Sequence, residues 1–190
     1  MMKEISKALK FILIFVVILG FIYPFFMTFI ANLIFPYQAN GSIIIKDGKP
    51  VGSELIGQNF DGSKWFQGRP SAVDYDALSS GGTNYALSNP KFTQEVEKNI
   101  SDFLKVNPGV NKKDIPVDIV TSSGSGLDPH ISPEAAYLQV KRVAKVNNLP
   151  EDVVKKLVDN NIEGRFLGIF GNPRVNVLKL NLSLLNELKK

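Results

Sequence analysis

The side chains of this 190-residue sequence that could do chemistry are concentrated in one stretch rich in serine and glycine. It follows a predicted strand and precedes a predicted helix, and its members are Ser122, Ser123, Gly124, Ser125 and Gly126. Backbone N–H groups in such a loop can form a nest that binds a phosphate. A P-loop needs wider glycine spacing followed by Lys and Ser or Thr, and this stretch has neither. We therefore favour a structural turn and keep nucleotide contact and partner contact as alternatives.

The only histidine of the chain, His130, lies two residues after Asp128. This spacing would let Asp128 orient His130 as a general base, with Ser123 or Ser125 as the nucleophile. The Gly-x-Ser-x-Gly pattern of a nucleophile elbow is not met, because position 122 is a serine. Hydrogen bonds from the two side chains to nearby backbone would explain the pair equally well. We expect a structural role, assign no catalytic residue, and keep Asp128 and His130 as candidates for nucleotide or partner contact together with the serine–glycine loops.

A second glycine pair follows a serine at Ser80, Gly81 and Gly82, and it superficially resembles the signature loop of ABC-type ATPases. A glycine pair in a polar loop is a weak signal, so we favour a turn over nucleotide contact here as well. Arg69 and Arg174 lie in two other predicted loops. Each arginine could pair with a carboxylate inside its own domain or on a partner protein, and the sequence leaves both alternatives open.

Composition excludes several classes of site. The chain has no cysteine and one histidine, which excludes disulfides, iron–sulfur clusters, thiol nucleophiles, and zinc sites built from cysteines or several histidines. We expect no metal site. The 22 basic and 18 acidic side chains give a net charge of only +4, and the basic residues do not cluster with aromatic ones. The sequence therefore argues against nucleic-acid binding.

Residues 11–35 form an apolar segment that predicts one transmembrane helix, since about 20 apolar residues cross a bilayer. The segment is longer than the apolar region of a signal peptide. Lys3, Lys7 and Lys10 precede it, so residues 1–10 are expected in the cytoplasm and residues 36–190 outside it. The protein is thus predicted to be a single-pass cell-membrane protein.

Two residues of the predicted span favour contact with a second membrane protein. Pro24 removes one backbone hydrogen bond and should kink the helix, and Gly20 lies one turn before it. A neighbouring helix would help to satisfy the freed carbonyl group. We favour packing of Gly20 and Pro24 against a partner, and a slightly bent lone anchor is the alternative.

The elements that must position these residues predict an α+β domain over residues 36–190. Strands are expected over 43–45, 115–121, 165–170 and 174–182, with a turn at Asp47 and Gly48. Three helices are expected to open at Pro90, Pro133 and Pro150, because a capping residue or a proline marks each start. Residues 57–90 read as a long irregular stretch, which is unusual unless it serves a purpose.

The motifs taken together resemble those of a known family. Gly52–Gln58, Phe66–Ala72 and Ser80–Asn84 come first, then residues 115–136 with the sequence IPVDIVTSSGSGLDPHISPEAA, and finally Gly171–Leu178. In this order they resemble the C subunit of Kdp-type potassium-transporting ATPases over nearly the whole chain, the anchor included. Asn172 stands where the family pattern leads us to expect a glutamate.

The resemblance implies an ATP-driven potassium import complex with three partners: a pore-forming subunit, an ATP-hydrolysing P-type subunit and a small accessory subunit. It implies a non-catalytic accessory role, in which the outer domain lies at the pore subunit and stabilises the complex. The alternative that it implies is a catalytic chaperone that raises the ATP affinity of the hydrolysing subunit. No cofactor is expected on the chain alone, and ATP would act through the complex.

Overall fold

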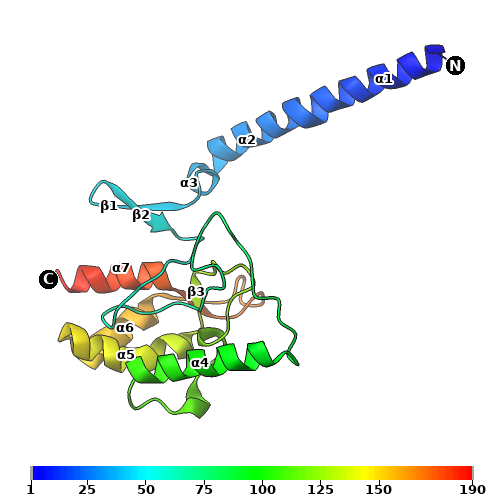
Figure 1. Ribbon diagram of the computed structural model, residues 1–190. Helices are drawn as coiled ribbons and strands as arrows, with labels where there is room; N and C mark the ends of the chain where they lie inside the picture. Colours follow the sequence, from blue (N-terminus) through cyan, green and yellow to red (C-terminus); the bar gives the residue numbers. More distant parts are fainter. Residues whose placement is uncertain (1, 190) are drawn as a thin grey trace. The chain divides into compact units, whose positions relative to one another are not determined.

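The computed structural model describes residues 2–189 and divides at Ser53 and Glu54 into two compact units (Figure 1). The first unit opens with a continuous helical run, Met2–Ile34, made of α1 (Met2–Val17), a π-helical turn η1 (Ile18–Ile22) and α2 (Tyr23–Ile34). None of its most apolar 18-residue window is buried within the chain, and it is long and apolar enough to cross a membrane. This is the single candidate span among the described residues.

The π-helical turn shows how the helix accommodates Pro24. The N–H group of Tyr23 donates to the carbonyl of Ile18, five residues earlier, so the helix widens where the proline ring would meet the preceding turn. Farther along, the hydroxyl of Thr28 donates to the carbonyl of Pro24 at 2.8 Å, and Asn32 Nδ2 donates to that of Thr28 at 2.9 Å. Both polar side chains are therefore satisfied within the helix itself, as a lipid environment demands.

A short helix, α3 (Pro36–Ala39), and a hairpin complete the first unit. Strands β1 (Ile43–Lys46) and β2 (Lys49–Ser53) pair in antiparallel register. Asp47 and Gly48 turn between them with φ of 52° and 74°, the left-handed conformation that two-residue hairpin loops require. The predicted strand and turn are confirmed here.

The second unit packs four helices with a small sheet, so the α+β prediction is confirmed. The helices are α4 (Pro90–Val106), α5 (Pro133–Asn147), α6 (Glu151–Asn160) and α7 (Val177–Glu187), and two 3₁₀ turns, η2 (Lys112–Asp114) and η3 (Val117–Ile119), join α4 to the sheet. The antiparallel sheet has the order β3 (His130–Ile131), β5 (Arg174–Asn176), β4 (Ile162–Glu163). Helices α5, α6 and α7 supply most of the buried core, including Val143, Val154, Leu180 and Leu184.

The three helix starts predicted from sequence are confirmed, and local capping explains them. The side chain of Asn89 accepts the N–H of Lys91 before α4, and that of Ser132 accepts the N–H of Ala135 before α5. Such bonds satisfy N–H groups that have no partner within the helix. Helix α6 begins directly after Pro150.

Three predicted strands are wrong in whole or in part. Residues 115–121 contain the 3₁₀ turn η3, in which both the N–H and the hydroxyl of Thr121 donate to the carbonyl of Val117. Residues 165–170 form a turn closed by one bridge between Phe166 and Phe170. Only 174–176 of the stretch 174–182 is strand, because Asn176 caps α7 by accepting the N–H of Lys179. The leucines at every second position of this stretch match the two-residue period of a strand, and those four residues apart also fall on one face of a helix.

Residues 54–89 hold no helix or strand, which confirms the irregular stretch predicted over 57–90 except at Pro90, and amide side chains fix their course. Asn181 accepts the N–H of Phe66 and donates to its carbonyl, both at 2.9 Å. Gln139 makes the same two bonds with Gln67: it accepts the N–H of Gln67 at 2.8 Å and donates to the carbonyl of Gln67 at 3.1 Å. The side chains of two helices thus supply the backbone hydrogen bonds that a neighbouring strand would supply in a sheet. Phe66 is fully buried.

The buried guanidinium of Arg142 completes this attachment. It is 6% exposed and donates to Asn107 Oδ1 at 2.8 Å, to Gln139 Oε1 at 2.7 Å, to the carbonyl of Trp65 at 2.9 Å and to that of Ser63. All four acceptors are neutral. Burial lowers the pKa of Arg142 to about 10, so the side chain stays charged at neutral pH.

Candidate functional site

The two glycine-rich loops singled out in the sequence lie against each other. The carbonyl of Ser125 accepts both the N–H of Gly81, at 2.9 Å, and the hydroxyl of Ser80, at 3.0 Å. A β-carbon on Gly82 would lie 3.0 Å from the carbonyl oxygen of Gly124. The glycines therefore serve a close approach of two backbones, 45 residues apart in the chain for Ser80 and Ser125.

Several N–H groups that could form an anion nest are already occupied. Gly81 donates to Ser125, Ser123 donates to the carbonyl of Pro70 at 3.4 Å, and Gly126 donates to the carbonyl of Ser123 at 3.2 Å. A phosphate would have to displace these bonds to use the same donors. The hydroxyl of Ser122 is also engaged, since it donates to Glu95 of α4 at 2.7 Å.

Asp128 ties the end of the second loop to the irregular segment and to the sheet. Its Oδ2 accepts from Arg69 Nη1 at 3.0 Å, and its Oδ1 accepts the backbone N–H of His130 at 3.0 Å and lies 3.4 Å from His130 Nδ1. Burial alone would raise the pKa of Asp128, but the hydrogen bonds from His130 and Arg69 outweigh it and lower the pKa to about 2. The carboxylate is therefore ionised throughout the neutral range.

A second carboxylate, Glu163 on β4, lies farther along the sheet. We call the ion pairs of Asp128 and Glu163 together the charge network. It accepts from Arg174 Nε at 3.0 Å and from Lys179 Nζ at 3.3 Å, and it lies 3.9 Å from His130 Nε2. Lys179 also reaches Glu54 at 2.9 Å. Burial opposes the ionised form, yet the bonds from Arg174 and Lys179 lower the pKa of Glu163. Arg69 and Arg174 thus both pair within the domain.

The histidine faces carboxylates on both sides, and its surroundings do not include the serines. Within residues 2–189, the polar contacts of the His130 ring run to Asp128 and Glu163, not to Ser123 or Ser125. Ser125 Oγ accepts instead the N–H of Leu127 at 3.1 Å. The arrangement acts as a connection between strands and loops, and it lacks the base–nucleophile contact of a hydrolase.

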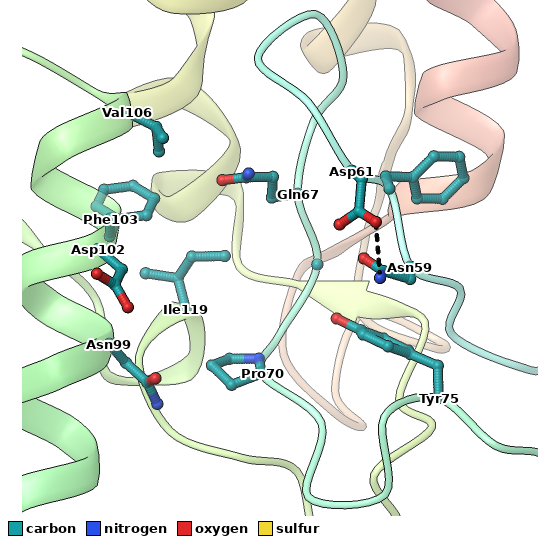
Figure 2. Close-up of a pocket in the computed structure, with 12 residues that line it drawn as sticks. Asn59, Asp61, Gln67, Pro70, Tyr75, Asn99, Asp102, Phe103, Val106 and Ile119 are labelled. Atoms are coloured by element: carbon teal, nitrogen blue, oxygen red, sulfur yellow. Dashed lines mark hydrogen bonds between the residues drawn. The ribbon is translucent and has the colours of Figure 1, made fainter.

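A surface pocket of about 270 Å³ lies between the irregular segment and α4 (Figure 2). Asp61, hydrogen-bonded to Asn59 at 3.2 Å, lies on one side, and Asp102 and Phe103 of α4 lie on the other. Tyr75 lies on the same side as Asn59 and Asp61. Burial, followed by the charges of Asp61 and Asp74, raises the pKa of Tyr75. The charged lining residues are both carboxylates, so the pocket disfavours anions such as nucleotides.

Sequence reasoning missed this pocket and the central part played by Glu163. Polar residues of a loop and of an exposed helix face carry no periodic signal, and Glu163 has no motif around it. Among the described residues, no group of three or more His, Asp or Glu side chains is placed to hold a metal ion.

Comparison with known proteins gives the family. A family model described as "K+-transporting ATPase, c chain", KdpC, matches residues 5–186. The chain belongs to the KdpC family. It is 77% identical to the potassium-transporting ATPase KdpC subunit of Caldanaerobacter subterraneus subsp. tengcongensis over 188 residues, which is 99% of this chain and 97% of that one.

Relatives at lower identity show the same coverage. The KdpC subunit of Clostridium kluyveri is 44% identical over 199 residues, with 98% of this chain and 95% of that one covered. A Bacillus cereus KdpC subunit is 46% identical over 186 residues, with 97% and 96% covered. The KdpC match therefore includes the helical run, the glycine loops and the charge network, and the resemblance inferred from the motifs is confirmed.

We predict that Gly126→Ala destabilises the domain by about 2 to 4 kcal/mol. Gly126 has φ of +69°, and its added β-carbon would lie 2.6 Å from Val73 Cγ2 and 2.8 Å from the carbonyl oxygen of Gly81. Gly124→Ala is the matched control, because nothing lies within 4 Å of its added β-carbon. Urea unfolding of the full chain in detergent, followed by circular dichroism, measures both. Equal midpoints for the two variants would contradict the close packing of the loops.

We also predict that acid destabilises the wild type more than Asp128→Asn. A carboxylate with a lowered native pKa stabilises the fold above its unfolded pKa, near 4, and this contribution is lost as pH falls toward about 2. At pH 7 the variant should be less stable by about 1 to 2 kcal/mol, allowing for partial exposure. Unfolding midpoints from pH 7 to pH 2 measure the difference. A gap that stays constant over this range would exclude the ion pair as its cause.

Proposed function

We propose that the chain is a non-catalytic accessory subunit of an ATP-driven potassium import complex, which it assembles and stabilises. The observation that carries this proposal is the match to KdpC subunits over both the helical run and the domain. The partners are those the motifs imply: a pore-forming subunit, an ATP-hydrolysing P-type subunit and a small accessory subunit. The domain lies outside the cytoplasm against the pore subunit, and residues 1–10 lie inside.

The helical run supports membrane anchoring beside another subunit. Gly20 lies within the π-helical turn, and nothing in the chain lies within 4 Å of where its β-carbon would be. A partner helix could approach the backbone closely at this point. Thr28 and Asn32 satisfy their own polar groups, so the contact at Gly20 and Pro24 would rest on shape.

A direct nucleotide-binding role has less support from the geometry. The N–H groups of Gly81, Ser123 and Gly126 already have acceptors, and the charged residues that line the pocket beside α4 are two carboxylates, Asp61 and Asp102. An outer domain would also be separated from cytoplasmic ATP by the membrane. In our proposal any effect of this chain on ATP affinity is transmitted through its partners.

Deleting this chain should leave the other subunits unable to form a stable complex. We expect that a tag on the ATP-hydrolysing subunit recovers the pore-forming subunit only when this chain is present, because the chain binds the assembly through both its helix and its domain. Co-purification from membranes, followed by potassium-stimulated ATP hydrolysis, measures the effect. Recovery of a fully active complex without this chain would overturn the assembly role.

Chemical labelling should place the domain outside the cell. The chain has no cysteine, so Ser63→Cys in the exposed irregular segment provides a single thiol. We expect a membrane-impermeant maleimide to label it in intact cells, whereas Ser6→Cys, in the segment proposed to be cytoplasmic, should react only after lysis. Both variants are made in the complete transporter. The reverse pattern would place the domain inside and would revive direct nucleotide contact.

A further inference from the structure

A turn between β4 and β5 exposes four large apolar side chains next to one another. They are 71, 73, 73 and 62% exposed, and they belong to Phe166, Leu167, Ile169 and Phe170, which we call the apolar tip. Single exposed apolar residues are common on soluble proteins, but four within five residues form a contiguous patch that indicates an interaction site.

The apolar tip is preformed. The N–H groups of Phe166 and Phe170 each donate to the other residue's carbonyl at 2.9 Å, which closes the turn at its base. Leu167 and Gly168 complete the turn with φ of 52° and 74°, and this conformation is unusual for a leucine. A β-carbon on Gly168 or Gly171 would meet nothing within 4 Å, so the turn does not pack on the rest of the domain there.

A short stretch of chain connects the candidate membrane span to the domain. After the helical run ends at Ile34, the hairpin brings the chain back, and Ser53 Oγ donates to the carbonyl of Gly41 at 2.7 Å. The second unit begins at the next residue, Glu54, about twenty residues along the chain after the helical run ends. A domain of this length has a radius of gyration of about 14 Å, so the short connection leaves a lipid surface within its reach.

The charges beside the tip suit a lipid surface. Arg165 precedes it and is exposed, and Arg174 follows it with 56% of its side chain exposed. Aromatic and aliphatic side chains flanked by arginine are typical of segments that lie in the headgroup region, where the cations interact with anionic lipids.

The area of the tip also favours lipid over a protein partner. Four side chains of this size can bury only about 600 Å² of their own surface. A stable protein interface buries about 800 Å² on each partner. A lipid interface has no such minimum, since it accepts isolated apolar side chains next to a tether that already supplies the attachment.

We propose that the apolar tip inserts into the interfacial region of the membrane that anchors the chain, and so gives the domain a second attachment to the bilayer. This contact is independent of the assembly role proposed above. It would add to the covalent connection through Ser53, and of the charge network only Arg174, paired with Glu163, lies beside the tip.

The test uses a polarity-sensitive fluorophore on a single introduced cysteine in the full chain, reconstituted into vesicles of phosphatidylcholine and phosphatidylglycerol. Ile169→Cys probes the tip, and Leu78→Cys is the matched control, because Leu78 is 96% exposed on the irregular segment of the same domain. Lipids carrying a nitroxide near the headgroup end of the acyl chain report contact with the bilayer. We expect quenching at position 169 to exceed that at position 78 about threefold or more, with a blue-shifted emission.

The same measurement on the assembled transporter separates lipid from protein. Retained quenching by the nitroxide lipids at position 169 supports insertion in the working complex. A label there that is shielded from an aqueous quencher but not reached by the nitroxide lipids would show a protein contact and overturn the proposal. Equal quenching of the two positions by the aqueous quencher would also overturn it.

Discussion

The domain depends on the buried cation of Arg142, which joins two helices to a segment with no secondary structure of its own. A charge at 6% exposure with only neutral acceptors is stable because each of its hydrogen bonds ends on an oriented oxygen. Removing it would take one donor from each of these oxygens, and a buried oxygen left without any donor costs about 1 to 3 kcal/mol. The irregular segment therefore follows one course, set by helix α5.

The position of the glycine loops and of the charge network follows from that course. Arg69 lies two residues after Gln67, whose backbone is paired with Gln139, and it reaches Asp128 at 3.0 Å. Because Asp128 also holds His130 on β3, a constraint that begins on α5 extends to the sheet. Double hydrogen bonds from Asn181 add the same restraint from α7. Loops ordered in this way present a fixed surface to a partner.

Sequence predicted what short-range chemistry decides. Asn89 and Ser132 cap their helices through hydrogen bonds to residues at most three positions away. Asp47 and Gly48 form a turn because both residue types readily adopt a left-handed backbone conformation. Sequence reasoning failed where local signals fit two structures and distant contacts also act: α7 replaces a predicted strand, with a local cap at Asn176 and long-range bonds from Asn181 to Phe66. The partners of Arg69 and Arg174 stayed open for the same reason. Arg142 and Gln139 gave no signal, because polar residues on a helix are ordinarily taken to face water.

The same geometry bears on how the proposed accessory subunit could affect a transporter. The charge network joins its carboxylates to Arg69, Arg174 and Lys179 of the same domain, so its ion pairs are satisfied before any partner arrives. Such a domain pays little ordering entropy on binding, since the loops are already fixed. In the proposed complex its influence on a remote site is then a coupling free energy, equal to the difference in how tightly it binds two states of its partners. Rigidity is what allows a surface to distinguish those states.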